Sequence, residues 1–178
     1  MSRSDGAHGD DRLHDFLIAQ LNIAHLRAPL DSPLVADFVA ALAPVNAHAD
    51  TAPGFVWRLQ HQDGDATPIR AFDDEMVVIN MSVWTSIEAL TDFVYQSTHR
   101  QVLAHRREWF ERLTDAHLVL WWIPRTDRPS VDEGRVRLER LRSLGPSAEA
   151  FTFRHAFPPP GTAPETLLEK STDTEATA

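Results

Sequence analysis

The chain has 178 residues, 43% of them hydrophobic, and a formal net charge of −9. This length is enough for one substantial core and does not require a second domain. No apolar run is long enough to span a membrane and the N-terminus lacks the layout of a secretion signal, so we expect a soluble cytoplasmic protein without a membrane partner. The absence of cysteine excludes disulfides, zinc–thiolate sites, iron–sulfur clusters and a cysteine nucleophile.

The negative charge is concentrated at the two ends of the chain. Residues 1–15 carry −2 and residues 161–178 carry −3, which leaves about −4 for the part between them. Because neither end has a periodic apolar pattern, we expect a flexible segment over 1–15, one domain over 16–160 and a disordered acidic tail over 161–178. No basic stripe with interleaved aromatic residues is present, which argues against nucleic acid as a partner.

The sequence of the first part of the expected domain predicts two strands and a helix. Phe16–Arg27 is apolar on both faces, which is typical of a strand covered on two sides. The residues that interrupt this pattern are Gln20, Asn22 and His25. A cap and a helix-opening proline at Ser32 and Pro33 begin a helix that runs to about Asn46, and Gly54–Gln62 is the second strand.

An alternating strand, Met76–Trp84, leads directly into one long predicted helix that reaches Phe110. One strand face carries Val77, Ile79, Met81 and Val83, and the other carries Asn80, Ser82 and Trp84. On the helix, the apolar arc consists of Ile87, Thr91, Val94, Tyr95, Thr98, Val102 and Trp109. His99 and Arg106 fall at the edge of this arc, so we expect an imidazole and a guanidinium to point inward.

The last part of the domain predicts two more strands with a helix between them. Ala116–Pro124 is the fourth strand, and Ser130–Leu144 is a charged helix that begins with the capping-box pattern SVDE. Glu149–Phe157 is expected to be a fifth strand that ends before Pro158. The residues that alternate along it are Phe151, Phe153, His155 and Phe157.

The order β-α-β-β-α-β, with an appended α-β, predicts an α+β fold of the ferredoxin-like, split β-α-β type. Such a fold has an antiparallel sheet with helices on one face. The strands Phe16–Arg27 and Met76–Trp84 are apolar on the other face as well, and a monomer would leave this patch exposed. A sheet-to-sheet homodimer is therefore the expected assembly.

Other chemistries find little support in the sequence. His99 and His105 lie six residues apart and do not form the i, i+4 pair of a helical metal site, so we predict no metal. There is no glycine-rich phosphate loop and no G-x-S-x-G motif. Nucleotide-dependent and serine-hydrolase mechanisms are accordingly set aside.

Six segments of the chain resemble a bacterial family named domain of unknown function 3291, which is similar to the dimeric α/β-barrel, antibiotic-biosynthesis-monooxygenase-like superfamily. They are FLIAQLNIAHLRAPLDSP, PGFVWRLQ, VVINMSVWTSIEALTDFVY, HRQVLAHRREWF, LVLWWIP and FTFRHAFPPP. The resemblance implies a dimeric α/β barrel with a cavity between sheet and helices in each subunit. Haem-degrading members of the superfamily have an asparagine in the first strand and a histidine in a helix. The resemblance implies that Asn22 corresponds to this asparagine and His99, loosely, to this histidine.

We predict that the chain binds or transforms a small aromatic or polyketide-like molecule, as a monooxygenase, cyclase or isomerase that uses no cofactor. His99 would accept a proton and Arg106 would stabilise an enolate or phenolate. The predicted substrate-binding residues are Asn22, Asn80, Trp84, Tyr95 and Trp57. Two alternatives stay open, a non-catalytic ligand-binding dimer and a haem-binding protein. For His99, a structural role at the core edge is also open.

Overall fold

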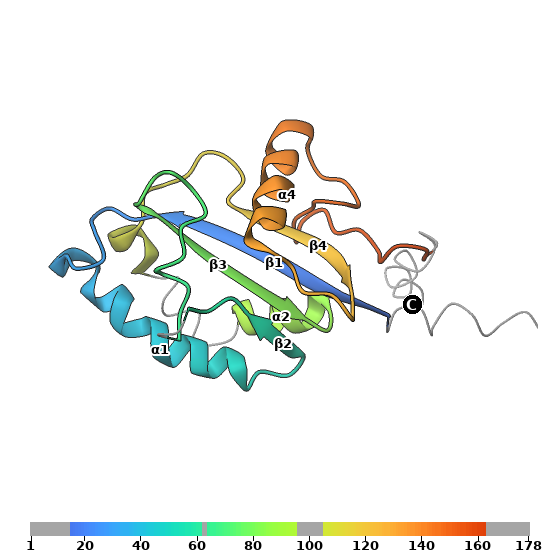
Figure 1. Cartoon of the computed structure of the whole chain (residues 1–178), viewed down its shortest axis with the longest axis horizontal. Coiled ribbons are helices and arrows are strands. Elements are labelled where there is room, and N and C mark those ends of the chain that lie inside the picture. The colour runs from blue at the N-terminus through green and yellow to red at the C-terminus, as the bar shows by residue number, and fades with distance from the viewer. Residues whose placement is uncertain (1–14, 62–63, 96–104, 163–178) are drawn as a thin grey trace, which may run out of the picture.

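The computed structural model describes residues 15–61, 64–95 and 105–162, and its centre is a four-stranded antiparallel sheet in the order β2-β3-β1-β4 (Figure 1). The strands are β1 (Phe16–His25), β2 (Phe55–Arg58), β3 (Val77–Trp84) and β4 (Leu118–Pro124). Helix α1 (Ala36–Asp50) joins β1 to β2, and α2 (Ile87–Tyr95) follows β3. This connectivity and strand order confirm the predicted ferredoxin-like α+β fold.

The central strand β1 is hydrogen-bonded to a neighbour on each side and buried on both faces. It pairs with β3 and with β4, which explains why almost every position from Leu17 to Ile23 is apolar. The pairing places Asn22 directly opposite Asn80 and Gln20 directly opposite Ser82. Residues opposite each other in an antiparallel pair point to the same side, so these four polar side chains share one face.

Helices α1 and α2 lie on that same face. Ala49 of α1 and Leu90 and Phe93 of α2 pack with Ile18 and Trp84 of the sheet in one apolar cluster. A short 3-10 helix, η2 (Pro33–Val35), precedes α1, and its cap Ser32 accepts a hydrogen bond from the Leu34 N–H at 3.3 Å. The helix start expected at Ser32 and Pro33 is confirmed.

The opposite face of the sheet is covered by α4 (Val131–Leu144), which Figure 1 shows across the sheet from α1. Ser130 Oγ accepts a hydrogen bond from the Glu133 N–H at 3.1 Å, so the predicted N-cap is confirmed. Leu138 and Leu141 pack against the sheet core on this side. At Gly134, a Cβ would come within 3.3 Å of the Leu21 Cβ, which shows how closely helix and strand approach.

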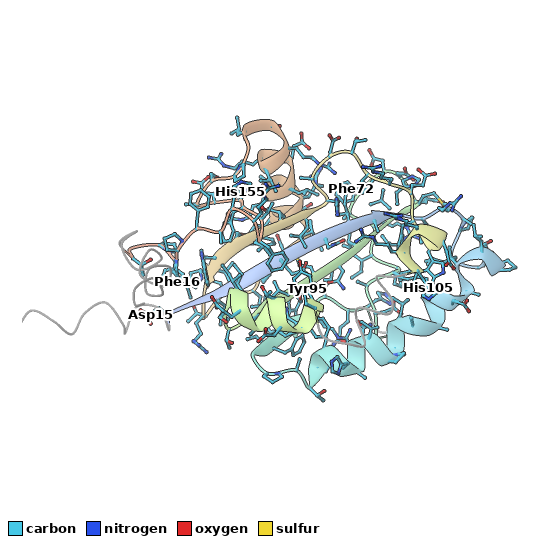
Figure 2. All side chains as sticks on the ribbon, turned by 180° about the vertical axis from the view of Figure 1, so that it is seen from behind. Asp15, Phe16, Phe72, Tyr95, His105 and His155 are labelled. Atoms are coloured by element: carbon cyan, nitrogen blue, oxygen red, sulfur yellow. The ribbon has the colours of Figure 1, made fainter. Side chains whose placement is uncertain are left out.

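A sheet-to-sheet homodimer requires this second face to be bare in the single chain, and the face is covered instead. The buried apolar residues of β1, β3 and β4 on this face are at most 6% exposed in the single chain and Val77 is partly buried, because α4 and partly buried hydrophobic residues of the segment between β2 and β3 cover the face. Phe72, from that segment, lies on the α4 side of the sheet in Figure 2.

The predicted fifth strand, Glu149–Phe157, does not form. Phe151 makes a single bridge to Leu120, with N···O distances of 2.8 and 2.9 Å, and the chain then turns between Thr152 and His155. The alternating aromatic residues instead pack into the cluster around Trp84: Phe151, Phe153 and Phe157 all belong to it. The alternation of aromatic residues in this segment therefore reflects their packing into the cluster and does not mark a strand.

The long helix expected after β3 is only partly within the described residues. α2 covers Ile87–Tyr95 and residues 105–109 are helical, whereas 96–104, which include His99, lie outside the described part. The first and second strands are shorter than predicted: β1 ends at His25, and β2 extends only from Phe55 to Arg58, with an irregularity between Phe55 and Trp57.

Candidate functional site: a polar strip on the sheet

Four neutral polar side chains lie across the middle of the sheet face that α1 and α2 cover. We call this set, Gln20, Asn22, Asn80 and Ser82, the polar strip. Ile18 and Trp84 lie at one end of it and Val78 at the other, each within an apolar cluster. Polar groups are expensive to bury without partners, so a strip of this kind inside an apolar face requires either internal hydrogen bonds or a ligand.

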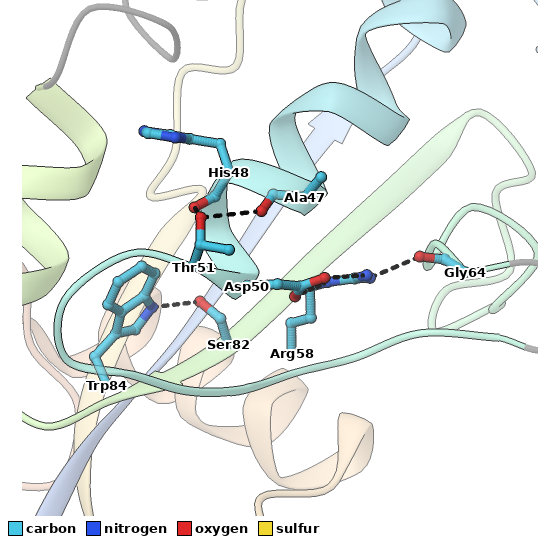
Figure 3. Close-up of polar contacts among 8 residues, drawn as sticks. All are labelled: Ala47, His48, Asp50, Thr51, Arg58, Gly64, Ser82 and Trp84. Atoms are coloured by element: carbon cyan, nitrogen blue, oxygen red, sulfur yellow. Dashed lines mark hydrogen bonds and ion pairs between the residues drawn. The ribbon is translucent and has the colours of Figure 1, made fainter.

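Internal hydrogen bonds satisfy part of the strip. Gln20 Nε2 donates to Asn80 Oδ1 at 2.8 Å and to Ser82 Oγ at 3.0 Å. The indole N–H of Trp84 donates to the same Ser82 Oγ at 2.8 Å; Figure 3 shows this bond. Ser82 thus accepts two hydrogen bonds, which leaves its own hydroxyl hydrogen to donate.

The strip is closed at one end and open at the other. Gln20 and Ser82 are 6% and 7% exposed, whereas Asn22 is half-buried and Asn80 is exposed. Because the Asn80 oxygen accepts from Gln20, the NH₂ group of Asn80 remains to donate at the open end. The open end therefore presents amide groups from two adjacent strands.

Aromatic rings border the closed end. The Trp84 ring lies 4.9 Å from that of Phe93 and 5.4 Å from that of Phe55, which meets it edge-on. His48 of α1 packs on Phe93 with ring centroids 5.7 Å apart. The aromatic layer thus connects both helices to the indole that donates to the strip.

The structure brings together three of the predicted site residues, Asn22, Asn80 and Trp84. Trp57 packs with the core on the opposite face, so the sheet separates it from the strip; the Arg128 guanidinium lies 5.8 Å from its ring centroid. Tyr95, labelled in Figure 2, is 66% exposed.

Of the two predicted catalytic residues, His99 is outside the described residues and Arg106 is exposed. The expected inward orientation of Arg106 is therefore wrong. Trp109, three positions later, is buried at 6% exposure, so the helix turns its indole inward and leaves the guanidinium in water, where a charge needs no partner. The inner side of α2 is likewise formed by Leu90 and Phe93.

Gln20 and Ser82 are not among the predicted site residues, although the sequence contains a signal for both. Each lies two positions from a predicted site residue on the same strand, Gln20 from Asn22 and Ser82 from Asn80, and therefore on the same face. His48 was also missed, because its contact with Phe93 joins two helices far apart in the chain.

The strip is uncharged, and its donors suit a neutral carbonyl or a phenol oxygen. Its amide, hydroxyl and indole groups are not the usual axial ligands of haem iron, so we assign no step to haem. Within residues 15–61, 64–95 and 105–162, no group of three or more His, Asp or Glu side chains is arranged to hold a metal ion. The helices in these ranges also include none long and apolar enough to cross a membrane.

Comparison with known proteins gives one family and several similar structures. Residues 17–167 match the profile of a family described as Domain of unknown function (DUF3291). No curated protein matches the chain. A structure from Pseudomonas aeruginosa is 11% identical, covering 64% of this chain and 98% of its own, with a TM-score of 0.44. SnoaB from Streptomyces nogalater, described as a cofactor-independent oxygenase, is 17% identical, covering 64% and 95%, with a TM-score of 0.39.

Proposed function

We propose that this chain, which belongs to the family described as Domain of unknown function (DUF3291), binds a small aromatic or polyketide-like molecule on its polar strip. The observation that carries the proposal is the exposed Asn80 at the open end of a hydrogen-bonded strip inside an apolar sheet face. A carbonyl or phenol oxygen of the ligand accepts from Asn80, and its apolar body lies against the surrounding hydrophobic side chains.

The oxygen-binding role follows from the direction of the hydrogen bonds. Gln20 and Trp84 both donate to Ser82, so this end of the network holds Ser82 as an acceptor and leaves its hydroxyl hydrogen available to donate. Asn80 is oriented by Gln20 in the same way. Groups fixed before the ligand arrives lose little entropy on binding, which favours a specific polar contact.

Catalysis is the finer part of the proposal. Removing a proton next to a carbonyl gives an enolate, and donors such as Asn80 stabilise the negative oxygen. In an isomerase the proton then returns to another position of the ligand, and in a cyclase the enolate carbon attacks a second carbonyl of the ligand, whose oxygen takes the proton. A monooxygenase also needs molecular oxygen as a substrate. His99 remains the predicted proton acceptor, because the strip itself contains only neutral amide and hydroxyl groups. Arg106, being exposed, has no assigned role in the step.

Binding can be tested with a matched pair of probes, 1-hydroxy-2-acetonaphthone and 2-ethylnaphthalene, by titration calorimetry. We expect the hydroxyketone to bind about tenfold more tightly, which corresponds to one or two net hydrogen bonds. Asn80→Ala should remove this difference, and Gln60→Ala, at an exposed position outside the strip, should keep it. Equal affinity of the wild type for both probes would refute the proposal.

A turnover assay distinguishes an enzyme from the alternative, a non-catalytic ligand-binding protein. Hydroxyketone incubated with the protein under air and under nitrogen is followed by its absorbance and by mass spectrometry. Product formed only under air indicates a monooxygenase, and product formed in both indicates an isomerase or cyclase. Binding without product in either atmosphere supports the non-catalytic alternative.

A homodimer is the assembly that we propose, through a surface other than the covered sheet face. The support is β2, which lies at the edge of the sheet and exposes Val56 (43%), since an edge strand has unpaired backbone groups that can pair with a second copy of the chain. Sedimentation of the wild type and of Val56→Glu tests this: a wild-type monomer at micromolar concentration would contradict it. The cytoplasm stays the predicted location.

A further inference from the structure

A cavity of about 340 Å³ lies between α1 and the segment 64–67. Its lining shares no residue with the polar strip, so it is a separate place for a ligand. The volume is within the range of small-molecule sites. The lining residues are Leu30, Val39, Leu42, Ala43, Asn46, Ala47, Asp50, Arg58, Gly64, Asp65 and Thr67. We call this cavity the α1 groove.

One face of α1 forms the long wall of the groove. The lining positions 39, 42, 43, 46, 47 and 50 repeat at intervals of three and four, which places them in one stripe along the helix. At 1.5 Å per residue, this stripe is about 16 Å long. It is apolar from Val39 to Ala43 and polar at Asn46 and Asp50. The groove therefore suits an elongated molecule with one apolar and one polar end.

The polar end is built around Arg58. Its side chain is 14% exposed and holds Asp50 in a two-pronged ion pair, with N···O distances of 2.8 and 3.2 Å. Nη1 of Arg58 also donates to the Gly64 carbonyl at 2.7 Å, so the arginine ties α1 and the segment 64–67 to β2 (Figure 3). The charge of Asp50 is thereby neutralised, and both walls of the groove are fixed.

Asp65 differs from Asp50 in its partners. Its Oδ1 accepts from the Thr67 N–H at 2.7 Å and from the Thr67 hydroxyl at 2.6 Å, both neutral donors. Among the described residues, no ion pair joins Asp65 to a basic side chain. The half-buried carboxylate thus leaves the polar end of the groove with one uncompensated negative charge beside the apolar wall.

We infer that the α1 groove binds a small primary amine, with its ammonium group at Asp65 and its apolar body along Val39, Leu42 and Ala43. The ammonium supplies the missing positive charge and donates to the free oxygen of a carboxylate already held in place by Thr67. An anion would meet the same charge with repulsion, and a neutral molecule would gain only the apolar contact. The groove therefore selects for charge as well as shape.

The test uses three probes of nearly equal size: 2-phenylethylammonium, 2-phenylethanol and 3-phenylpropionate. With the full chain at pH 7, we expect calorimetry to show the ammonium binding about tenfold more tightly than the alcohol, and the carboxylate not binding. Asp65→Asn, which keeps an oxygen for Thr67, should reduce the ammonium to the affinity of the alcohol. Equal affinity of wild-type protein for ammonium and alcohol would overturn the inference without any variant.

A pair of matched variants locates the bound probe. Ala43→Leu extends a side chain into the groove and should abolish binding of the ammonium, whereas Ala40→Leu makes the same change at an exposed position of α1 outside the lining. Circular dichroism confirms that both are folded. Binding that survives Ala43→Leu, or that is lost equally in both variants, would show that the probe binds elsewhere. Failure here leaves the polar strip untouched, since the two sites share no residue.

Discussion

The Gln20 amide nitrogen lies 2.8 Å from the Asn80 side-chain oxygen, and this contact joins two strands across 60 residues of sequence. The same nitrogen reaches Ser82, so one buried glutamine organises both polar side chains of β3. At the closed end Gln20 therefore stabilises the fold through Ser82, and at the open end it orients Asn80. Because the two contacts lie at different ends of the strip, stability and binding can be tested independently.

Gln20→Leu should lower the free energy of unfolding by about 1–3 kcal/mol, because Ser82 loses a buried partner and Asn80 loses its orienting donor. Asn80→Ala, at the exposed end, should cost less than about 1 kcal/mol while weakening hydroxyketone binding. Urea denaturation of the two variants measures the contrast. A larger loss of stability for Asn80→Ala than for Gln20→Leu would contradict the assignment of closed and open ends.

Ser82→Ala should lower the free energy of unfolding by more than the loss of a single hydrogen bond would. Ser82 Oγ accepts from both Gln20 and Trp84, so its removal strands two buried donors, at about 1–3 kcal/mol each. In Trp84→Phe the second donor is gone, and the double variant should then cost less than the sum of the two single ones. Additive losses of stability would show that the indole N–H contributes nothing through Ser82.

Leu138→Ala should lower the free energy of unfolding by about 2–5 kcal/mol, because the side chain is 1% exposed where α4 covers the sheet. Leu144→Ala, in the same helix at 71% exposure, should change it by less than about 0.5 kcal/mol. Thermal or urea unfolding compares the two. Similar, small effects would mean that α4 does not cover this face, which would restore the case for a sheet-to-sheet dimer.

Asp74 provides a prediction for pH. The Met76 backbone N–H holds the pKa of this carboxyl below its usual value of 3.8, with a further lowering by His25, whose Nε2 lies 3.1 Å from Asp74 Oδ2. Since the folded-state pKa is depressed, the stabilisation is complete above about pH 4 and is lost as pH falls through the folded-state value. Asp74→Asn should therefore lower stability at pH 7 and have little effect near pH 2.

Urea denaturation at the two pH values measures the difference in stability between wild type and Asp74→Asn, which should be smaller at pH 2 than at pH 7. Asp73→Asn, at the neighbouring exposed position, is the control. A difference between wild type and Asp74→Asn that stays constant from pH 7 to pH 2 would show that the carboxylate charge is irrelevant to stability.

Local patterns predicted most of the elements, since they depend on residues close in sequence. The alternation in Val77–Trp84 gave the correct faces of β3, and SVDE gave the correct start of α4. The same kind of pattern failed at Glu149–Phe157, because a strand needs a partner along its length and only Phe151 of this segment pairs with the sheet, at Leu120. Periodicity can show which residues are buried but not what buries them.

The sequence by itself determined the order of elements, the polar character of Asn22 and Asn80, and the membership of one family. Only the tertiary structure decided that Gln20 and Ser82 complete the strip, that Trp57 lies across the sheet from it, and that α4 covers the second face. The physical reason is distance along the chain. Strand pairing and helix packing join residues tens of positions apart, and their energies depend on the register and the face chosen, which no local window contains.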